Sequence, residues 1–578
     1  MKGQSIWVKL ILVVCVIAAI VVFSLTYLDA SYQVEEISVA SSTLDKWQLE
    51  KSELNGAPLY ENKNIYTFEN NSKINNIYIT VFPTEDKKGK MRTFKNLDLL
   101  TAANKVDIFD LDASIIYGDK DGNLNQVKNP DIVNATLKAR GSSSLNSAYK
   151  SYKLNLMDGT ELFFGQKTLN FNKHAYDISK VSNKFCMDIM STIPNMSSLR
   201  TNFVVLYIRD AALPKKSQKF KYYGLFTQVE QPNRTFLKVR GFDVNGSLYK
   251  AANFEFKMSP ALKNVNEAGY NVDEFSKILE IREGVDHSKL IDMIKDINDP
   301  NLDFMKMFKK HFNEDNYLTW MATNIILGNE DTISQNFLLY SPKNALTWYF
   351  MPWDYDGTFK FGANKSNFEA PISLKGIQRL SSVMLHRRFF RQPGNILKLT
   401  NKIRTLLDTV FTEKKVQALV DSYKPVLAKV MTKAPDIIIS RLAPNEINAY
   451  LNDFYKQIRV NYSNYIQSNK YPAPVFVSEP IRNKNGTIQF GWEPTFDYNG
   501  NLDTYGIEFS KDPYFKRDLI NIKGLTQTQF LTKKKFPKGT YCLRITITDS
   551  RGNVQKSLDI MRDLVPIPEF GAQKVTFR

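Results

Sequence analysis

The sequence is poor in cysteine and histidine, the residues on which most transition-metal and redox sites depend. Its 578 residues include three cysteines and four histidines. Cys15, Cys186 and Cys542 lie far apart and form no Cys-x-x-Cys pair, which argues against a structural zinc site or a thiol redox centre. Cys186 and Cys542 fall in regions that we assign to different domains, so we expect free thiols. The few histidines likewise argue against a histidine-rich zinc or di-metal site.

Acidic residues are also scarce relative to basic ones. The chain has 77 Lys and Arg against 59 Asp and Glu, a formal net charge of +18 and a pI near 9.3. Such a surface favours anionic partners, namely nucleic acid, anionic lipid, polyphosphate or acidic glycans. No RNP motif, zinc-finger spacing or basic zipper accompanies the charge, so no nucleic acid is expected. The alternative is a solvated lysine-rich surface without a specific partner.

Residues 10–28 form a run without any charged side chain. Its 19 residues are close to the length that crosses a bilayer core. Lys2 and Lys9 precede it, and Asp29, Glu35 and Glu36 follow it. The positive-inside rule then places residues 1–9 in the cytoplasm and the bulk of the chain outside a bacterial cell, attached through a single-pass helix and a stalk at 29–61. A cleaved signal peptide is the competing interpretation.

The central part of the chain divides into a strand-rich half and a helix-rich half. Between residues 62 and 260, strand patterns occur at 74–82, 132–138, 151–156, 203–208 and 222–230, with one helix near 178–190. Helical periods then dominate, at 304–327, 396–410, 413–431 and 446–466. We therefore predict an α+β body spanning 62–470, with two lobes and a cleft between them.

The period returns to two after the Pro-containing segment at 469–475. Strand patterns at 487–492, 504–509 and 539–548 alternate with Asn- and Gly-rich turns. About a hundred residues with a central Trp492 and a late Gly-x-Tyr strand look like a fibronectin type III or immunoglobulin-like β-sandwich. We assign residues 471–578 to this domain.

The segments at 329–336 and 349–359 carry the strongest chemical pattern. Asp331 and Asn336 stand in an Asp-x-x-x-x-Asn frame, and an apolar stretch then leads to Asp354 and Asp356 at a turn. Two strands joined through 341–344 would bring Asp354 back towards Asp331 and Asn336. Protein kinases use one Asp to orient the acceptor hydroxyl, and an Asn and a second Asp to hold magnesium. The alternative is turn chemistry, because Asp, Asn and Gly also favour turns.

A Gly/Ser loop between two strand patterns is a second candidate. Gly141, Ser142 and Ser143 could present backbone N–H groups to an anion. Arg140, Lys150 and Lys153 could add positive charge, although strand parity does not decide which lysine enters the cleft. An ordinary polar hairpin is the alternative. The strand at 222–230 ends at Glu230 before a polar turn, where a two-lobed nucleotide enzyme would place its purine-contacting hinge; any strand end could look the same.

Four ordered motifs resemble the spore-coat protein H (CotH) kinase family over roughly residues 65–470. They are RGSSS…KSYKLNL, YYGLFTQVEQ, GNEDTISQNFLLY and WYFMPWDYDGTF. The resemblance implies an atypical protein-kinase-like fold that transfers the γ-phosphoryl group of ATP to Ser or Thr of a secreted or coat protein. It departs from the family's pattern at Ser142, where an Asn is usual, and at Glu330, where an uncharged residue is usual.

Roles are implied position by position by the same resemblance. Asp331 is the expected catalytic residue, and Asn336, Asp354 and Asp356 are the expected Mg²⁺ ligands. The nucleotide is expected to contact Arg140, Gly141, Ser142, Ser143, Lys150 or Lys153, and Glu230. ATP and Mg²⁺ are the implied cofactors, and a protein or envelope glycan is the phospho-acceptor.

Two functions therefore follow from the sequence. The first is a membrane-anchored, extracytoplasmic atypical Ser/Thr kinase acting on a cell-surface or secreted protein, or on envelope polysaccharide. The second is a non-catalytic surface scaffold that holds anionic envelope polymers, and the scarcity of ATP outside cells favours it.

Overall fold

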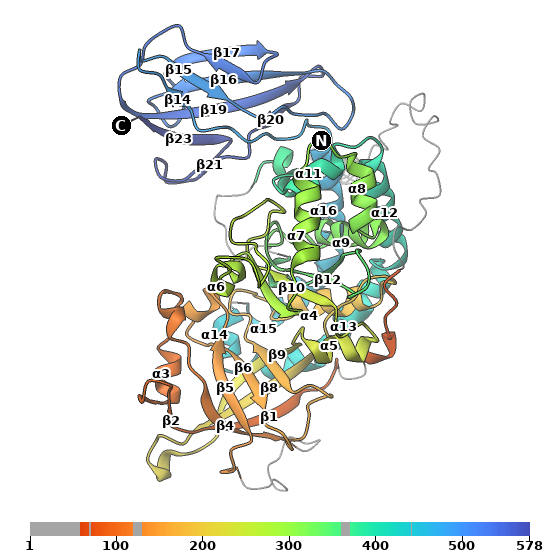
Figure 1. The fold of residues 1–578 in the computed structure, drawn as a ribbon. Coiled ribbons are helices and arrows are strands. Elements are labelled where there is room, and N and C mark those ends of the chain that lie inside the picture. Colours follow the sequence, from red (N-terminus) through yellow and green to blue (C-terminus); the bar gives the residue numbers. More distant parts are fainter. Residues whose placement is uncertain (1–57, 69–70, 119–129, 360–369, 441, 578) are drawn as a thin grey trace, which may run out of the picture. The chain divides into compact units, whose positions relative to one another are not determined.

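The computed structural model describes residues 58–68, 71–118, 130–359, 370–440 and 442–577 (Figure 1). The predicted membrane helix at 10–28, Cys15 and nearly all of the predicted stalk lie outside these ranges. Within them, no helix combines the length and apolar character needed to cross a bilayer.

The first part of the described chain is a closed seven-stranded barrel with the strand order β1-β4-β5-β6-β7-β9-β8. Most of its neighbouring strands are antiparallel, and β1 and β8 are parallel. The barrel strands are β1 (Asn75–Val81), β4 (Leu111–Tyr117), β5 (Ala135–Arg140), β6 (Ser151–Leu156), β7 (Thr168–Asn172), β8 (Thr201–Asp210) and β9 (Lys221–Glu230). Alternate apolar side chains such as Leu137, Tyr152 and Leu154 fill the interior as one hydrophobic core. The strand patterns predicted in this region are thus confirmed.

Short elements precede the barrel strands or connect them along the chain. They are η1 (Lys63–Ile65), β2 (Thr84–Glu85), β3 (Met91–Arg92), α3 (Phe94–Asp98), η2 (Ala102–Asp107), η3 (Ser143–Asn146), η4 (Lys215–Ser217) and α4 (Ser182–Ser191). Helix α4 confirms the single helix predicted between the strands, and all ten of its residues are buried.

A four-stranded sheet and a set of helices follow the barrel. The sheet has the order β11-β10-β12-β13, with β10 (Ser247–Ala251), β11 (Leu279–Glu283), β12 (Phe337–Ser341) and β13 (Tyr349–Pro352). The helices before its last two strands are α5 (Arg234–Arg240), α6 (Val272–Ser276), α7 (Ser288–Asn298), α8 (Phe304–His311) and α9 (Glu314–Leu327). Helix α9 is buried almost all round, so it forms the centre of a second hydrophobic core.

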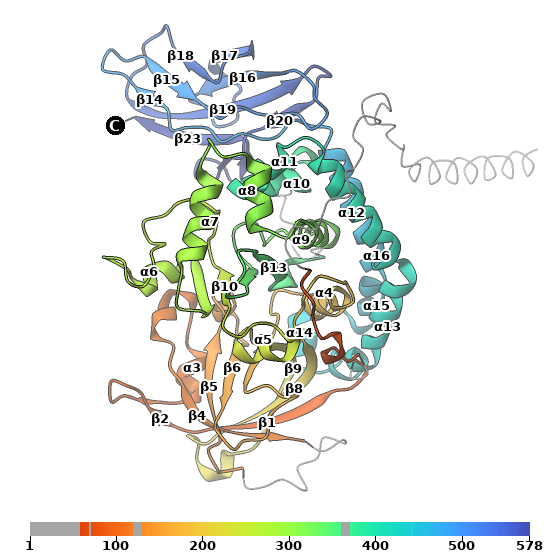
Figure 2. The ribbon, with the colours of Figure 1, turned by 45° about the vertical axis from the view of Figure 1, so that its right-hand side comes forward.

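The remaining helices follow β13 along the chain. They are η5 (Tyr355–Gly357), η6 (Ile372–Leu374), α10 (Ile377–Leu380), α11 (Met384–Phe390), α12 (Asn395–Thr409), α13 (Glu413–Val430), α14 (Asp436–Ser440), α15 (Pro444–Asn452) and α16 (Phe454–Ser468). Helices α12 and α16 both contact α9, and α13 contacts α16 and α4 (Figure 2). The helices predicted at 396–410 and 413–431 are confirmed within one residue.

Two predicted helices are each broken in the structure. The helix expected at 304–327 stops at His311, because Phe312 adopts an extended conformation and pairs with Trp348. The side chain of Asn313 then accepts a hydrogen bond from the backbone N–H of Asn316 and starts α9 afresh. The helix expected at 446–466 divides at Asp453, whose near-helical backbone angles let the apolar period run through the break.

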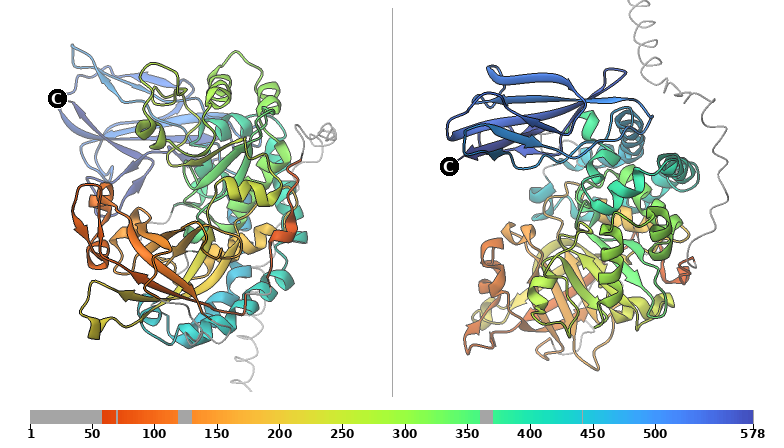
Figure 3. Two further views of the ribbon diagram at one scale, coloured as in Figure 1. Left: turned by 60° about the horizontal axis from the view of Figure 1, so that its bottom comes forward. Right: turned by 45° about the horizontal axis from the view of Figure 1, so that its top comes forward.

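The C-terminal region is a β-sandwich with its own core (Figures 1 and 3). One sheet has the order β14-β15-β18; the other has the order β17-β16-β19-β20, with β23 also paired to β19. The strands are β14 (Ile481–Arg482), β15 (Ile488–Gly491), β16 (Asp503–Ser510), β17 (Asp518–Leu525), β18 (Gln529–Leu531), β19 (Gly539–Asp549), β20 (Val554–Lys556), β21 (Ile560–Met561), β22 (Glu569–Phe570) and β23 (Ala572–Phe577). The Tyr541 hydroxyl donates to the Pro537 carbonyl (2.8 Å), as the tyrosine corner of such sandwiches does. The fibronectin assignment itself stays a prediction.

A buried ion pair fastens α14 to the outside of the barrel. Lys173 Nζ lies 2.8 Å from Asp436 Oδ1, and neither side chain is exposed to solvent. Asp436 Oδ2 also accepts a hydrogen bond from the backbone N–H of Leu225 in β9 (2.8 Å). The close approach depends on Gly224, where an added Cβ would lie 2.2 Å from Asp436 Oδ2.

We predict that Gly224→Ala destabilises the protein far more than Gly159→Ala. The two glycines have nearly the same φ, +83° and +82°, but a Cβ at Gly159 would meet nothing within 4 Å. The control should therefore cost only the backbone strain, about 1–2 kcal/mol. Gly224→Ala should cost at least about 2 kcal/mol more, because it overpacks the site and displaces a buried carboxylate. Chemical denaturation of the full chain measures both, and equal losses would contradict the proposed contact.

Candidate active site

The hairpin formed by β12 and β13 brings two of the predicted site residues to the same end of a sheet. Phe337 pairs with Pro352 in antiparallel register. Asn336 immediately precedes β12, and Asp354 follows β13 after one residue. The predicted hairpin is confirmed, and with it the return of the chain towards Asn336.

Asp331 joins this group through direct hydrogen bonds. Asn336 Nδ2 donates to Asp331 Oδ2 (2.7 Å), and Gln335 Nε2 donates to Asp331 Oδ1 (2.9 Å). The turn that carries Asp331 begins where Gly328, at φ +63°, ends α9. Each oxygen of the Asp331 carboxylate is thus held in place by a neighbouring side chain.

Several residues near this end of the hairpin have positive φ angles. Asn336 has φ +58° and Asp354 has φ +59°, while His174 and Lys180 have φ +47° and +63°. Non-glycine residues adopt this conformation at an energetic cost, and such residues cluster at functional sites. Asn and Asp tolerate it better than other side chains do.

Asp354 lies in an unusual electrostatic environment. Burial, together with the nearby charge of Asp356, raises the pKa of Asp354 to about 6. His174, Arg140 and Lys250 act in the opposite direction but do not restore the usual pKa. A carboxylate destabilised by burial and by a second carboxylate is a group that a bound cation would stabilise.

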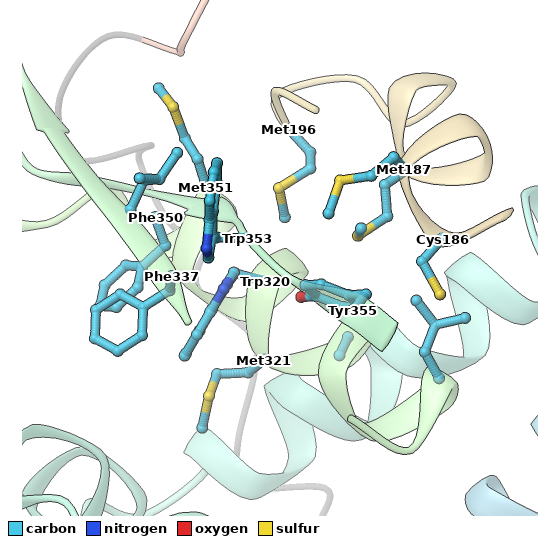
Figure 4. Packing of buried hydrophobic residues seen from close by; sticks show 14 of the residues in the cluster. Cys186, Met187, Met196, Trp320, Met321, Phe337, Phe350, Met351, Trp353 and Tyr355 are labelled. Carbon is cyan, nitrogen blue, oxygen red and sulfur yellow. The ribbon is translucent and has the colours of Figure 1, made fainter. Parts of the chain in front are cut away.

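The turn that presents Asp354 is anchored by the residues on either side of it. Trp353 and Tyr355 are both buried and enter the cluster that contains Trp320, Phe337 and Phe350 (Figure 4). The backbone N–H of Tyr355 also donates to the Asn183 side-chain oxygen in α4 (2.8 Å). Packing on both sides therefore fixes the carboxylate between them.

Asp356 is held from the segment that follows β7. His174 Nδ1 lies 3.4 Å from Asp356 Oδ2, and the His174 side chain is almost completely buried. Lys180 Nζ donates to the His174 carbonyl (2.7 Å). Burial lowers the pKa of Lys180 to about 8, and Asp356 is among the charges that oppose this shift.

The structure separates the two lysines that sequence parity left undecided. Lys150 is buried, and its Nζ donates to the carbonyl oxygens of Leu145 (2.6 Å) and Ser147 (2.8 Å). Lys150 therefore holds together the loop that follows β5. Lys153 points the other way, away from the barrel core formed by Tyr152 and Leu154.

Lys153 belongs to a group of positive charges outside the barrel. Burial lowers the pKa of Lys153, and the charges of Lys138, Arg282 and Arg140 lower it further. The Arg140 guanidinium lies over the Trp353 ring at 6.0 Å and bonds the Asn172 side chain. Burial lowers the pKa of Arg140 to about 10, and the main opposing effect comes from Asp354. Arg140 and Lys153 thus lie on the Asp354 side of the barrel.

The loop between β5 and β6 has the tight geometry expected of a glycine turn. Gly141 has φ +100°, and a Cβ there would lie 1.9 Å from Ser144 Oγ, so only glycine fits. Ser142 is exposed, and Ser143 begins the 3₁₀ turn η3. Anion binding by Gly141, Ser142 and Ser143 stays a prediction.

The Glu230 carboxylate forms ion pairs with residues other than those around Asp354. Its carboxylate pairs with Arg200 (2.6 Å) and with the fully buried Arg240 (2.6 Å). Burial alone would raise the pKa of Glu230, but the two arginines outweigh it and lower the pKa. The structure therefore does not bring the Glu230 side chain, or Lys150, into the candidate site.

Four residues of the site were missed from the sequence. His174 contacts Asp356, and Lys250 lies over the Trp353 ring at 5.6 Å. Glu280 bridges Lys250 (2.8 Å) and Arg282 (2.6 Å). Isolated charged residues in β10 and β11 carry no sequence motif, and neither strand alternates between buried and exposed residues, so no local signal indicated them.

The donor set fits a hard divalent cation. Asp354 and Asp356 supply carboxylates, and the Asn336 amide oxygen lies at the same end of the hairpin. Oxygen donors of this kind suit Mg²⁺, which is commonly held by one or two carboxylates together with phosphate oxygens. In the described part of the chain, no three His, Cys, Asp or Glu residues gather as a complete protein-only metal site.

Comparison with known proteins places the chain in a family. A match to the CotH kinase protein family covers residues 137–468, and the chain belongs to this family. The inner spore coat protein H of Bacillus subtilis (strain 168) is 25% identical over 317 residues, covering 54% of this chain and 83% of that protein.

Solved structures that were matched include two kinases. The Helicobacter pylori proinflammatory kinase CtkA is 11% identical, with coverage of 55% of this chain and 91% of that one and a TM-score of 0.24. The golgi casein kinase is 10% identical, with coverage of 58% and 71% and a TM-score of 0.22. These TM-scores are too low to define a shared fold, and the predicted two-lobed layout stays a prediction.

We predict that Asp354→Asn stabilises the protein at pH 8 but not at pH 4. The pKa of Asp354 is raised in the folded state, so the unfolded chain loses this proton first and folding stability falls as pH rises from about 4 to 6. The cost remains at higher pH, where the Asn variant avoids it. The expected gain is about 1–3 kcal/mol at pH 8. Unfolding curves at both pH values, without divalent cations, measure it; an equal gain at both would contradict this assignment.

Proposed function

We propose that this protein is an atypical kinase that transfers the γ-phosphoryl group of ATP to a hydroxyl acceptor. One observation carries the proposal: the β12–β13 register brings Asn336 and Asp354 to one end of the hairpin, and Asn336 binds the Asp331 carboxylate directly. Membership of the CotH kinase protein family supports the same activity. Orienting one hydroxyl and neutralising phosphate charge are what phosphoryl transfer chiefly requires of a protein.

Each residue has a role that follows from its position. Asp331 orients the acceptor hydroxyl, because its carboxylate is fixed by Gln335 and Asn336. Asp354 and Asn336, assisted by Asp356, would hold Mg²⁺. When bound with ATP, this ion supplies charge neutralisation for the phosphates. Arg140 and Lys153 add fixed positive charge on the barrel side.

The acceptor and the location complete the proposal. The acceptor is Ser or Thr of a cell-surface or secreted protein, with an envelope polysaccharide as the second choice. The apolar segment at 10–28 would anchor the chain in the membrane with its bulk outside the cell. A non-catalytic scaffold is the competing function, and it predicts no response to Mg-ATP.

We predict that Asp331→Asn and Asp354→Asn both lose transfer activity but differ in nucleotide binding. Either change should lower the rate of label transfer from ATP by at least about 10²-fold. Asp354→Asn should also lose the rise in melting temperature caused by Mg-ATP, whereas Asp331→Asn should keep it, because ligand binding stabilises the folded state.

Glu330→Gln is the matched control for these variants. Glu330 adjoins Asp331, but its half-exposed carboxylate pairs with Arg379 (3.0 Å), so activity should remain. Full transfer by Asp331→Asn or Asp354→Asn would refute the proposed roles. The absence of any Mg-ATP shift in the wild-type chain would favour the scaffold.

We predict that Lys153→Met and Lys150→Met have opposite consequences. Lys153→Met should weaken Mg-ATP binding by about 10- to 100-fold with little loss of stability, because it removes a charged contact. Lys150→Met should cost about 1–3 kcal/mol of stability, because two loop carbonyls lose their buried donor. Its nucleotide affinity should stay near the wild-type value. Calorimetric titration with Mg-ATP measures the affinity of each variant, and thermal unfolding measures its stability. If Lys150→Met weakened nucleotide binding and Lys153→Met did not, Lys150 would be the phosphate-binding lysine.

A further inference from the structure

Two loops at one edge of the C-terminal sandwich bring six basic residues together. The turn between β14 and β15 carries Arg482 and Lys484, and the loop between β18 and β19 carries Lys533, Lys534, Lys535 and Lys538. We call these six residues the basic loop pair. The backbone N–H of Phe536 donates to the Gly486 carbonyl (2.8 Å), so the two loops are joined directly.

The backbone of the basic loop pair is firmly held. Phe536 is buried in the sandwich core, between two flanking exposed stretches of the loop. Arg482 Nε donates to the Phe536 carbonyl (3.0 Å), and Thr532 Oγ1 donates to the Lys534 carbonyl (2.9 Å). A Cβ at Gly486 would lie 3.3 Å from Lys535 Cβ, which shows how closely the loops approach. The charges are therefore carried by a fixed backbone.

No acidic residue balances these charges within either loop. The sequence has no Asp or Glu between Glu479 and Glu493, and none between Asp518 and Asp549. Among the ion pairs of the described residues, none includes a member of the basic loop pair. Elsewhere in the same domain, by contrast, Arg544 and Lys556 both pair with Glu569. Like charges held together without partners repel one another, and a polyanion would relieve that repulsion.

We propose that the basic loop pair binds a linear polyanion with closely spaced phosphate groups. The five lysines are exposed, and they present point charges on flexible stems instead of the planar fork that recognises a single anion. Affinity would then come from the number of charges and from the release of counterions, and it would depend steeply on salt. The partner would hold the C-terminal domain in an anionic matrix. This inference does not depend on the proposed phosphoryl transfer.

The test uses the full chain and a polyphosphate of about 100 units as the probe, with inorganic phosphate as the short comparison. We expect polyphosphate to bind and to lose affinity linearly on a double-logarithmic plot against salt. The triple variant Lys533→Gln, Lys534→Gln, Lys535→Gln should bind at least about 30-fold more weakly, because it removes half of the clustered charge.

A matched control variant distinguishes binding at the basic loop pair from an effect of the protein's net charge. Lys215→Gln, Lys216→Gln, Lys219→Gln removes three exposed lysines around η4 of the barrel and should change affinity by less than about 3-fold. Equal losses in the two triple variants, no binding by the wild-type chain, or equally tight binding of inorganic phosphate would overturn the proposal.

A footprint on the wild-type chain provides a second measurement that needs no variant. Polyphosphate should protect Lys533, Lys534 and Lys535 from amine acetylation, as read by mass spectrometry, while Lys215 and Lys216 stay reactive. Protection in nanodiscs of anionic lipid, without protection by polyphosphate, would identify a bilayer as the partner and refute the polymer.

Discussion

The buried ion pair between Lys173 and Asp436 is the interaction on which the arrangement of the site depends. It joins the end of a barrel strand to a helix far along the chain, and both side chains are withdrawn from water. Removing one partner from such a pair commonly costs about 3–5 kcal/mol, because the other charge is left buried and unpaired. The pair therefore fixes α14 against Leu225 of the barrel. His174 follows Lys173 directly, so the same interaction positions the imidazole that contacts Asp356.

Charge balance around Asp354 explains why these elements must be placed accurately. Burial raises the pKa of Asp354, and the nearby charge of Asp356 raises it further. Arg140 from the barrel and Lys250 from the second sheet compensate in part, so the site is assembled from separate hydrophobic cores. A small movement of either element would change the pKa of Asp354, because charge interactions in a poorly solvated site weaken little with screening. The groups that would receive a cation and a phosphate are thus held by the fold before any ligand arrives.

Sequence patterns predicted those parts of the site that depend on contacts between residues close together in the sequence. The β12–β13 hairpin could be predicted because two apolar runs flank a Pro-Lys-Asn turn, and its register brings Asp354 towards Asn336. The choice between Lys150 and Lys153 could not, because it depends on which face of β6 meets the barrel core. His174, Lys250 and Arg282 could not be predicted either, since each reaches the site through contacts with segments far away in sequence. Glu230 illustrates the converse: its strand was predicted, but its buried partners Arg200 and Arg240 were not.

Backbone strain distinguishes the chemical interpretation of the turn from the conformational one. If Asn336 and Asp354 served only to turn the chain, glycine would suit both positions better, because it adopts φ near +58° without steric cost. The chain instead carries side chains at both positions and accepts roughly 1 kcal/mol of strain at each. The Asn336 side chain accounts for part of this cost through its bond to Asp331. The side chain of Asp354 does not offset the strain in this way, because burial and the charge of Asp356 make its ionised form unfavourable. A partly buried carboxylate that is strained and electrostatically disfavoured is what a cation site requires, and this supports the proposal that Asp354 binds the metal ion of the phosphates.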